Sequence, residues 1–388
     1  MLRVQEVERA SDLARHRDAW NAVVAGSARS DLFQTYEWLT TWLESFWKDK
    51  PIAFLLVQRD HTLVGLAPLL RDEKGVLWCP RSLVSPINPH VPRSDMLFLD
   101  GQQQAGLDAV LAHLQSTRRR VKLSFRHVDQ ASPVLAALPA VLDHQRLATV
   151  RWEGSGSPLV NISGDWEGYL KSRSGHFRSE LKRKVKKLNQ AGAVRWALVT
   201  TVEECDRVME DVLQIERNSW KEKTRSSFTA RHELEHFYRE LARRCAEAGW
   251  LRMHLLHLDS KPVAYIYGAV YKNVYYAIKT SYDEAYRSLS PGAALFDHAL
   301  HDAFDQGLAR FDFLGAEARW KSEMANAVRG HANVCVFSRG QIMCHWCGLY
   351  EHGLKPFVKA RVPMLVVVTR KLRRSRESDR PRGTDRSS

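Results

Sequence analysis

The apolar positions of this chain follow two spacings. Apolar residues at every second position predict strands, and apolar residues three or four positions apart predict amphipathic helices. The first half predicts strands at 2–8, 51–58, 63–70, 76–79, 96–99, 121–125 and 146–152, and helices at 11–24, 36–47, 104–117 and 133–143. The second half predicts helices around 177–188 and at 202–218, 230–247 and 293–306, and strands at 193–200, 250–258, 262–270, 274–278 and 309–314. The expected fold class is α/β (α+β).

The two halves repeat one order of elements. Each has helices, a three-stranded meander with an aspartate-led turn (at Asp60 and at Asp259), a helix and one more strand. We interpret this order as an internal duplication with a period of about 190 residues. The GSGS run at 154–157 is the best interior linker. The expected domains are therefore 1–153 and 158–345, each a mixed, mostly antiparallel sheet flanked by helices, followed by a basic tail at 346–388.

One loop of the second half has the features of an anion site. A strand at 274–278 leads into a loop that closes on Ser290, Pro291 and Gly292, and a helix follows. Serine is a good N-cap, and proline fits the first helical position. Gly292 lets a ligand approach the backbone closely, and helix N-terminal amides suit a phosphate or pyrophosphate. An ordinary strand-to-helix turn explains the same residues equally well.

Positive charge is concentrated in two segments. The net charge is +14, and residues 170–190 hold eight Lys/Arg against one Glu, while residues 355–388 hold eleven Lys/Arg against three acidic residues. The rest of the chain is therefore close to neutral, unlike a protein that is basic all over. On the first segment, Phe177, Leu181, Val185 and Leu188 share one helical face, so the cations point outward. That face is either simply solvated or binds a polyanionic acceptor, a nucleic acid or a nucleotide phosphate.

The N-terminal residues, the cysteine content and the basic tail bear on the cellular location of the protein. The N-terminal residues contain no apolar stretch typical of a signal peptide, and six cysteines in 388 residues do not suggest a disulfide framework. We expect a cytoplasmic protein. The tail combines a short apolar run at 364–368 with several cations, which fits either an anionic membrane surface or a disordered segment.

Two sequence patterns resemble metal sites, and we expect no metal at either. His232 to His236 read H-E-x-x-H, but both histidines fall opposite the apolar face of their predicted helix and would point to solvent. Cys344 and Cys347 form one C-x-x-C without a second pair, although a structural zinc site needs four ligands. Buried core thiols would explain the pair.

Several short blocks carry a family resemblance: FQTYEW at 33–38, VGLAPL at 64–69, FRSELKRKVKKL at 177–188, SPGA at 290–293 and FDFLGAEARWK at 311–321. Together with the order of elements, they resemble the Gcn5-related N-acetyltransferase (GNAT) superfamily. The likeness is greatest to its tandem-domain branch, which includes Fem-type transferases and acetyltransferases associated with cellulose and exopolysaccharide synthesis. The resemblance implies two GNAT domains, the first degenerate and the second catalytic.

The resemblance also implies a donor site. In GNAT proteins the strand before the loop and the strand after the helix part, and the acyl-thioester arm enters between them. Here Arg287, Ser290, Pro291, Gly292 and Ala293 would hold the diphosphate of an acyl-coenzyme A. The usual loop pattern is stretched by two residues after Arg287, so the identity of the anion stays open.

Acyl transfer to an amine needs orientation of the reactants, donors to the oxyanion and a path for the amine proton. Tyr282, Asp312 and Lys321 are the candidate catalytic residues; each is otherwise a solvated side chain of a loop. We expect transfer of an acyl group, acetyl above all, from acyl-coenzyme A to an amine or hydroxyl of a small-molecule, cell-envelope or polysaccharide precursor. The alternatives are a Fem-like ligase that uses aminoacyl-tRNA and a non-catalytic accessory protein of polysaccharide synthesis. The basic tail would allow a membrane-peripheral location.

Overall fold

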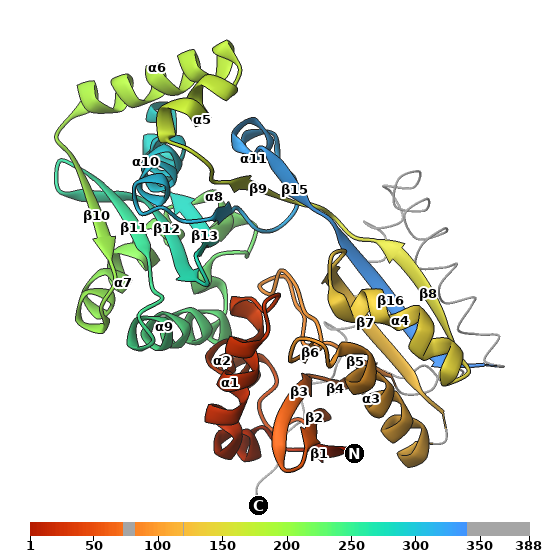
Figure 1. Cartoon of the computed structure of the whole chain (residues 1–388). Helices are drawn as coiled ribbons and strands as arrows, with labels where there is room; N and C mark the ends of the chain where they lie inside the picture. The colour runs from red at the N-terminus through yellow and green to blue at the C-terminus, as the bar shows by residue number, and fades with distance from the viewer. Residues whose placement is uncertain (73–81, 119, 340–388) are drawn as a thin grey trace, which may run out of the picture.

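The computed structural model describes residues 1–72, 82–118 and 120–339. The predicted strand at 76–79, the cysteine pair and the basic tail lie outside these residues. The described chain folds into two α/β halves that pack against each other (Figure 1). None of its helices within the described ranges is long and apolar enough to cross a bilayer.

The first half contains two sheets. One sheet has the order β1-β2-β3-β6 and the other β4-β5-β7-β16-β8, in which β16 spans His331–Ser338. Apolar side chains of α1 and α2 pack on one face of the first sheet, and those of α3 and α4 form a core with its other face and with β7 and β16 of the second sheet. The elements are β1 (Leu2–Val7), η1 (Ala10–His16), α1 (Arg17–Gly26), η2 (Leu32–Gln34), α2 (Tyr36–Phe46), β2 (Phe54–Arg59), β3 (Thr62–Ala67), β4 (Leu70–Arg71), β5 (Leu83–Val84), β6 (Leu97–Phe98), α3 (Gln103–Thr117), β7 (Lys122–Asp129), α4 (Pro133–His144) and β8 (Leu147–Glu153).

The second half is built on one seven-stranded sheet with the order β10-β11-β12-β13-β14-β9-β15. Helices α5, α6 and α10 pack on one face, and α7 and α9 on the other. The elements are β9 (Ser157–Asn161), α5 (Trp166–Ser172), α6 (Gly175–Ala191), β10 (Val194–Val199), α7 (Val202–Arg217), α8 (Trp220–Lys223), η3 (Phe228–Ala230), α9 (His232–Glu247), β11 (Met253–Leu258), β12 (Lys261–Tyr271), β13 (Val274–Tyr282), η4 (Glu284–Leu289), α10 (Pro291–Asp305), β14 (Arg310–Asp312), α11 (Arg319–Met324), β15 (Ala327–Arg329) and β16 (His331–Ser338).

One strand crosses from the second half to the first. Strand β9, directly after the predicted linker, lies between β14 and β15 of the second sheet. Strand β16 returns to the first half and lies between β7 and β8. Residues 331–338, which fall within the expected domain 158–345, thus complete a sheet of the first half. The apolar pattern of a strand gives no signal of the sheet that it joins.

Details of the two meanders support the predicted duplication. The turn residues Asp60 and His61 have φ of 48° and 68°, and Asp259 and Ser260 have φ of 48° and 66°. Each meander also has a register shift at the same place, between Val57 and Gln58 and between Leu256 and His257. Turn and shift both recur 199 residues later, so the expected period of about 190 was slightly short.

Equivalent helices of the two copies, α2 and α9, pack against each other and join the halves in one core. The ring of Trp38 meets that of Phe237 edge-on at 5.8 Å, and Phe33 meets Tyr276 at 5.5 Å. Between β12 and β13, the Lys272 Nζ donates to the carbonyl oxygens of Val24 and Ser27, both at 2.7 Å. This lysine supplies donors to carbonyl groups that the end of α1 leaves unpaired.

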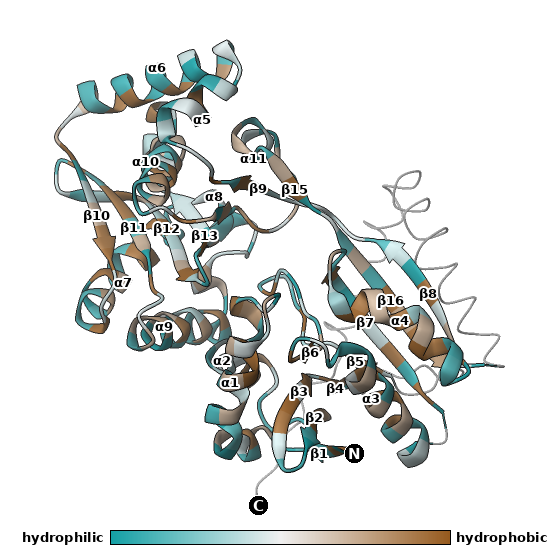
Figure 2. Cartoon of the chain, viewed as in Figure 1, coloured by the Kyte–Doolittle hydropathy of each residue, from teal (hydrophilic) through white to brown (hydrophobic). Residues whose placement is uncertain are grey.

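The predicted faces of the basic helix α6 are confirmed. Leu181 and Leu188 are buried, Phe177 and Val185 are half-buried, and the helix ends at Ala191, before Gly192. The cations Arg178, Lys182, Arg183, Lys186 and Lys187 are exposed. Figure 2 shows the resulting alternation of hydrophobic and hydrophilic residues along α6.

Candidate functional site

The two parallel strands β13 and β14 separate in the middle of the second sheet. They pair at three positions, the last being Tyr276 opposite Asp312. Beyond that point β13 continues to Tyr282, whereas β14 ends. The chain after β14 turns away through Leu314 and Gly315, whose φ angles of 54° and 62° are both left-handed. The edge of β13 from Ala277 onward therefore faces a gap instead of a neighbouring strand.

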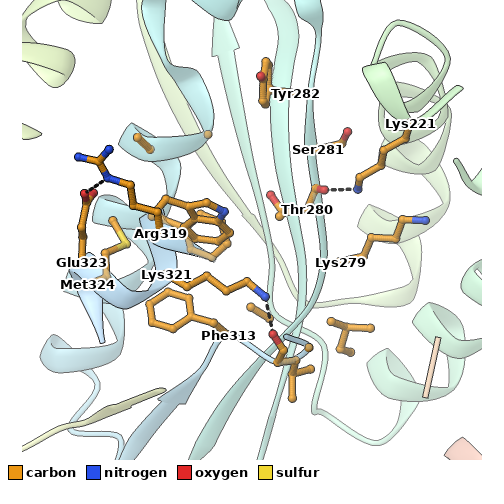
Figure 3. A pocket seen from close by; sticks show the side chains of 18 of the residues that line it. Lys221, Lys279, Thr280, Ser281, Tyr282, Phe313, Arg319, Lys321, Glu323 and Met324 are labelled. Atoms are coloured by element: carbon orange, nitrogen blue, oxygen red, sulfur yellow. Dashed lines mark hydrogen bonds and ion pairs between the residues drawn. The ribbon is translucent and has the colours of Figure 1, made fainter. Parts of the chain in front are cut away.

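This gap opens into a cavity of about 820 Å³. The edge of β13, the start of α10, the turn after β14 and helices α6, α8 and α11 form its walls (Figure 3). Pro89, His90 and Pro92 of the first half also line it. The Pro-rich segment thus contributes to the site from the half that lacks the Ser-Pro-Gly loop.

The start of α10 differs from the prediction in one respect. Ser290 is the N-cap of α10, but it has left-handed backbone angles and makes no side-chain cap hydrogen bond. It also ends η4, where its own amide donates to the Arg287 carbonyl at 3.1 Å. The sequence pattern could not show this, because it gave no sign that the short helix η4 ends directly where α10 begins.

The first turn of α10 consequently offers few free donors. Pro291 has no N–H, and the amides of Ala293 and Ala294 donate to the Ser290 carbonyl oxygen at 3.1 and 3.3 Å. The donor that this turn can offer to a ligand is the Gly292 amide. An anion held here needs additional donors from elsewhere.

Of the predicted donor-site residues, Gly292 and Ala293 line the cavity. Tyr282, a predicted catalytic residue, lines it as well and lies beside Gly292, where an added Cβ would be 3.5 Å from the tyrosine Cδ1. Ser290, Pro291 and the exposed Arg287 are not among the described lining residues. The structure therefore brings three of these six predicted residues together.

Lys321 also lines the cavity, next to the half-exposed Trp320. Its Nζ donates to the carbonyl oxygens of Leu314 at 2.5 Å and of Ala316 at 3.4 Å. Burial lowers the pKa of Lys321, and the charge of Asp312 opposes that shift. In this arrangement the lysine fixes the turn that separates the two strands.

Asp312 is fully buried away from the described cavity lining. Its Oδ2 is 2.6 Å from the Nη2 of Arg93 in the first half, and its Oδ1 accepts the Leu314 amide at 3.0 Å. Arg93 is itself buried and is 3.5 Å from Asp31. Burial alone would lower the pKa of Arg93, but Asp312 and Asp31 raise it above its usual range. The geometry gives Asp312 a structural contact between the halves rather than a place on a proton path.

A buried charged cluster lies on the other wall of the cavity. Glu216 of α7 accepts the Tyr265 hydroxyl at 2.6 Å and the Phe228 amide at 2.9 Å. Lys221 is 3.3 Å from one of its carboxylate oxygens, and Lys279 is 3.7 Å from the other. Figure 3 shows Lys221 and Lys279 on one side of β13, with Arg319 and Lys321 on the other.

The sequence analysis did not select this cluster. Lys279 directly follows the apolar run predicted as a strand at 274–278, and a lysine that continues a buried strand is the one available signal. Glu216 lies on a helix whose other acidic residues are exposed or half-buried, so its burial could not be read from the pattern. The cluster forms only when α7, α8 and β13 come together.

Helix α6 forms the cationic rim of the cavity. His176 and Lys184 line it, together with Phe177 and Leu181. Lys187 reaches the loop before α10, where its Nζ donates to the Ser288 carbonyl oxygen at 2.9 Å. The basic helix thus lies beside the loop that the sequence analysis identified as an anion site.

The residues of the H-E-x-x-H motif are not among the described residues that line the cavity. His232 and His236 are exposed on α9, as predicted. Within the described residues, no group of three or more His, Cys, Asp or Glu side chains is placed to bind a metal ion.

Comparison with known proteins identifies the second half. Residues 175–322 match the model of the acetyltransferase (GNAT) domain. The solved structure of FemX superposes with a TM-score of 0.56 at 12% identity, covering 89% of this chain and 99% of FemX. A conserved protein of unknown function from Bacteroides thetaiotaomicron gives 0.55 at 13%, covering 86% and 99%. The C-terminal domain of an Agrobacterium fabrum protein described as a lysylphosphatidylglycerol synthetase gives 0.51 at 12%, covering 87% and 96%.

At these identities the structures show a shared fold, which extends over both halves of the chain. No curated protein matches the sequence significantly. The predicted tandem arrangement and the mixed α/β fold class are confirmed.

The buried ion pair between the halves can be tested by removing one partner. Arg93→Met removes the 2.6 Å partner of the buried Asp312 carboxylate and leaves it only Arg329, 4.0 Å away; loss of such a partner costs about 3–5 kcal/mol of unfolding free energy. Removing the exposed Arg319–Glu323 pair by Arg319→Met should cost less than about 1 kcal/mol. Urea unfolding of both variants measures the difference.

The double variant Arg93→Met/Asp312→Asn provides the control, because it removes the unpaired charge. It should recover part of the loss. Equal stability of Arg93→Met and Arg319→Met would contradict a structural role for the pair.

Proposed function

We propose that this chain, which carries a GNAT acetyltransferase domain at residues 175–322 on a two-domain fold shared with FemX, is an acyltransferase that uses acyl-coenzyme A. Its acceptor would be an amine or hydroxyl of a cell-envelope or polysaccharide precursor. One observation carries the proposal: the parallel strands β13 and β14 part after Tyr276 and Asp312 and open into the large cavity. This gap has the shape that an extended thioester arm requires.

The residues around the gap fit a coenzyme A donor. The Gly292 amide can donate to one phosphate oxygen, and Gly292 leaves room at the helix start. The remaining negative charge needs a cation and further donors, and Lys184 supplies the charge at the cavity rim, next to the imidazole of His176 on the same helix. This division of the phosphate contacts between α10 and α6 compensates for the stretched loop after Arg287.

Aromatic side chains of the cavity suit the acceptor. Trp220 of α8 and Trp320 of α11 line it, with 46% and 40% of their surface exposed. Large aromatic faces of this kind offer apolar contact to a flat or ring-shaped group, such as a sugar. This is what supports a saccharide-containing acceptor over a free small amine.

Catalysis would rest on positioning and on the free edge of β13. Backbone amides beyond Ala277 have no β14 partner, so they can donate to the oxyanion that develops at the acyl carbonyl. The cavity walls hold donor and acceptor close together, which replaces a bimolecular encounter by an intramolecular one. Tyr282, beside Gly292, would orient the donor.

The cationic face of α6 favours a second candidate, transfer from an aminoacyl-tRNA. Five exposed cations on this helix could contact RNA phosphates next to the cavity. Binding of tRNA but not of coenzyme A would select this candidate. Binding of neither would select a non-catalytic accessory role, and the basic tail would then be the first place to seek a membrane or protein contact.

The acyl-coenzyme A proposal is tested by release of free thiol from a panel of acyl-coenzyme A donors, together with calorimetric titration of coenzyme A and of tRNA. We expect coenzyme A to bind and tRNA to bind weakly. The weak binding of tRNA should also fall steeply as the salt concentration rises, because it rests on exposed cations.

A variant tests the placement of the donor. Gly292→Trp fills the entrance beside Tyr282 and should weaken coenzyme A binding by more than about tenfold, or 1.4 kcal/mol. Gly292→Ala is the matched control, since its Cβ would make only an ordinary 3.5 Å contact and should leave affinity within about twofold. Unchanged coenzyme A affinity in Gly292→Trp would refute this donor site.

A further inference from the structure

We propose that Lys279 is the base that removes the proton from the acceptor nucleophile during acyl transfer. The proposal rests on the acyltransferase function proposed above and adds a catalytic residue to it. It starts from geometry, because Lys279 lies on the open edge of β13 three residues beyond the last pair with β14. A base there is next to the place where donor and acceptor must meet.

The side chain is held in one position. Its Nζ donates to the Ser226 carbonyl oxygen at 2.8 Å and lies 4.3 Å from the ring centre of Phe228 and 5.1 Å from that of Tyr238. About 10% of the side chain is exposed. A neutral amine in this position can keep its bond to Ser226 and still direct its lone pair into the cavity.

Charged and titratable groups face Lys279 from each element around it. Glu216 comes from α7, Lys221 from α8, Tyr238 from α9 and His90 from the first half. The His90 Nδ1 is 3.0 Å from the Tyr238 hydroxyl. The cluster therefore holds one carboxylate against two lysines, so one of the two amines can be neutral without leaving Glu216 unpaired.

The electrostatics agree with this position. Burial lowers the pKa of Lys279 to about 7, the charge of Glu216 opposes the shift and that of Lys221 adds to it. A base with a pKa near the working pH is present in its neutral form and still binds the proton firmly. Burial also lowers the pKa of Lys221, but that lysine is tied to Glu216 and to the Thr280 carbonyl.

Three other titratable groups of the described cavity lining, Glu180, Glu323 and His90, are less suitable bases. Glu180 and Glu323 form ion pairs with Arg183 and Arg319 at the rim. His90 is neutral because burial and nearby cations lower its pKa to about 4, which makes it a weak base. The predicted candidate Asp312 is occupied by Arg93.

The step balances with the groups named. The acceptor nitrogen or oxygen forms a bond to the acyl carbon, and the carbon–sulfur bond of the thioester breaks. The acceptor proton moves to the neutral Lys279 Nζ, and the sulfur leaves as a thiolate. Lys279 then releases the proton to water in the cavity, and the thiolate takes up a proton from solvent, so no other reactant is needed.

The test is the pH profile of thiol release with the acyl-coenzyme A and acceptor that the wild-type protein accepts. In the wild type, a plot of kcat/KM against pH should show a rising limb with its midpoint near pH 7. Lys279→Met keeps the apolar stem over Phe228 and should lower kcat/KM by about 10² or more and abolish that limb. Lys279→Arg should be equally inactive, because arginine keeps the charge but does not lose its proton.

Lys221→Met gives a readout that a structural role would not produce. It removes a positive charge that lowers the pKa of Lys279, so the limb should move to higher pH while activity at high pH persists. Thermal melts of all three variants check that they fold.

The outcomes separate the two proposals. No thiol release by the wild type with any donor overturns the acyltransferase function, and Lys279 as its base falls with it. An active wild type with a folded Lys279→Met variant that keeps the limb and more than half of kcat/KM overturns only the role of Lys279. Loss of activity in Lys279→Met with an unmoved limb in Lys221→Met also overturns it, because the titrating group is then another one.

Discussion

The buried ion pair between Arg93 and Asp312 determines how the candidate site is built. Asp312 is the last residue of β14, and the same carboxylate holds the first half through Arg93 and receives the Leu314 amide that turns the chain away. The Asp312 side chain therefore links three features. They are the end of the pairing between β13 and β14, the turn that Lys321 holds, and the contact between the halves. Both charges are out of water, and although Asp31 lies 3.5 Å from Arg93 and Arg329 lies 4.0 Å from Asp312, their closest contact of 2.6 Å forms only when the halves dock correctly. Opening of the sheet and assembly of the halves are thus coupled.

The duplication shows how one of two similar modules comes to hold the large cavity. Both copies keep the meander, its turn and its register shift. They differ after the third strand, where one copy has the Ser-Pro-Gly start of α10 and the other has the Pro-rich segment that covers the cavity. Strand β16, which follows the second copy in sequence, then lies between β7 and β8 and ties the second half to the first. One copy opens its sheet, and the other supplies part of the wall.

The cavity separates two kinds of charge. Exposed and rim cations of α6 face solvent, where they can attract an anionic ligand at little cost. Lys221, Lys279 and Glu216 are instead buried together, where burial favours the neutral amine and the nearby carboxylate limits the shift. A binding function suits the first group and proton transfer suits the second. Their positions on opposite sides of the open strand edge match the two sides that donor and acceptor would occupy.

The sequence by itself determined the elements with a strong period, the repeated meander and the amphipathic face of α6, because these depend on local spacing. It also pointed to Gly292, Tyr282 and Lys321, which the structure places at one cavity. Only the tertiary structure decided that β16 joins the first half, since the apolar pattern of a strand carries no information about the strands it will pair with. Likewise, Asp312 became an interhalf contact and Lys279 a buried amine through residues up to 219 positions away in sequence. Burial and charge pairing of this kind arise from packing, which no local pattern encodes.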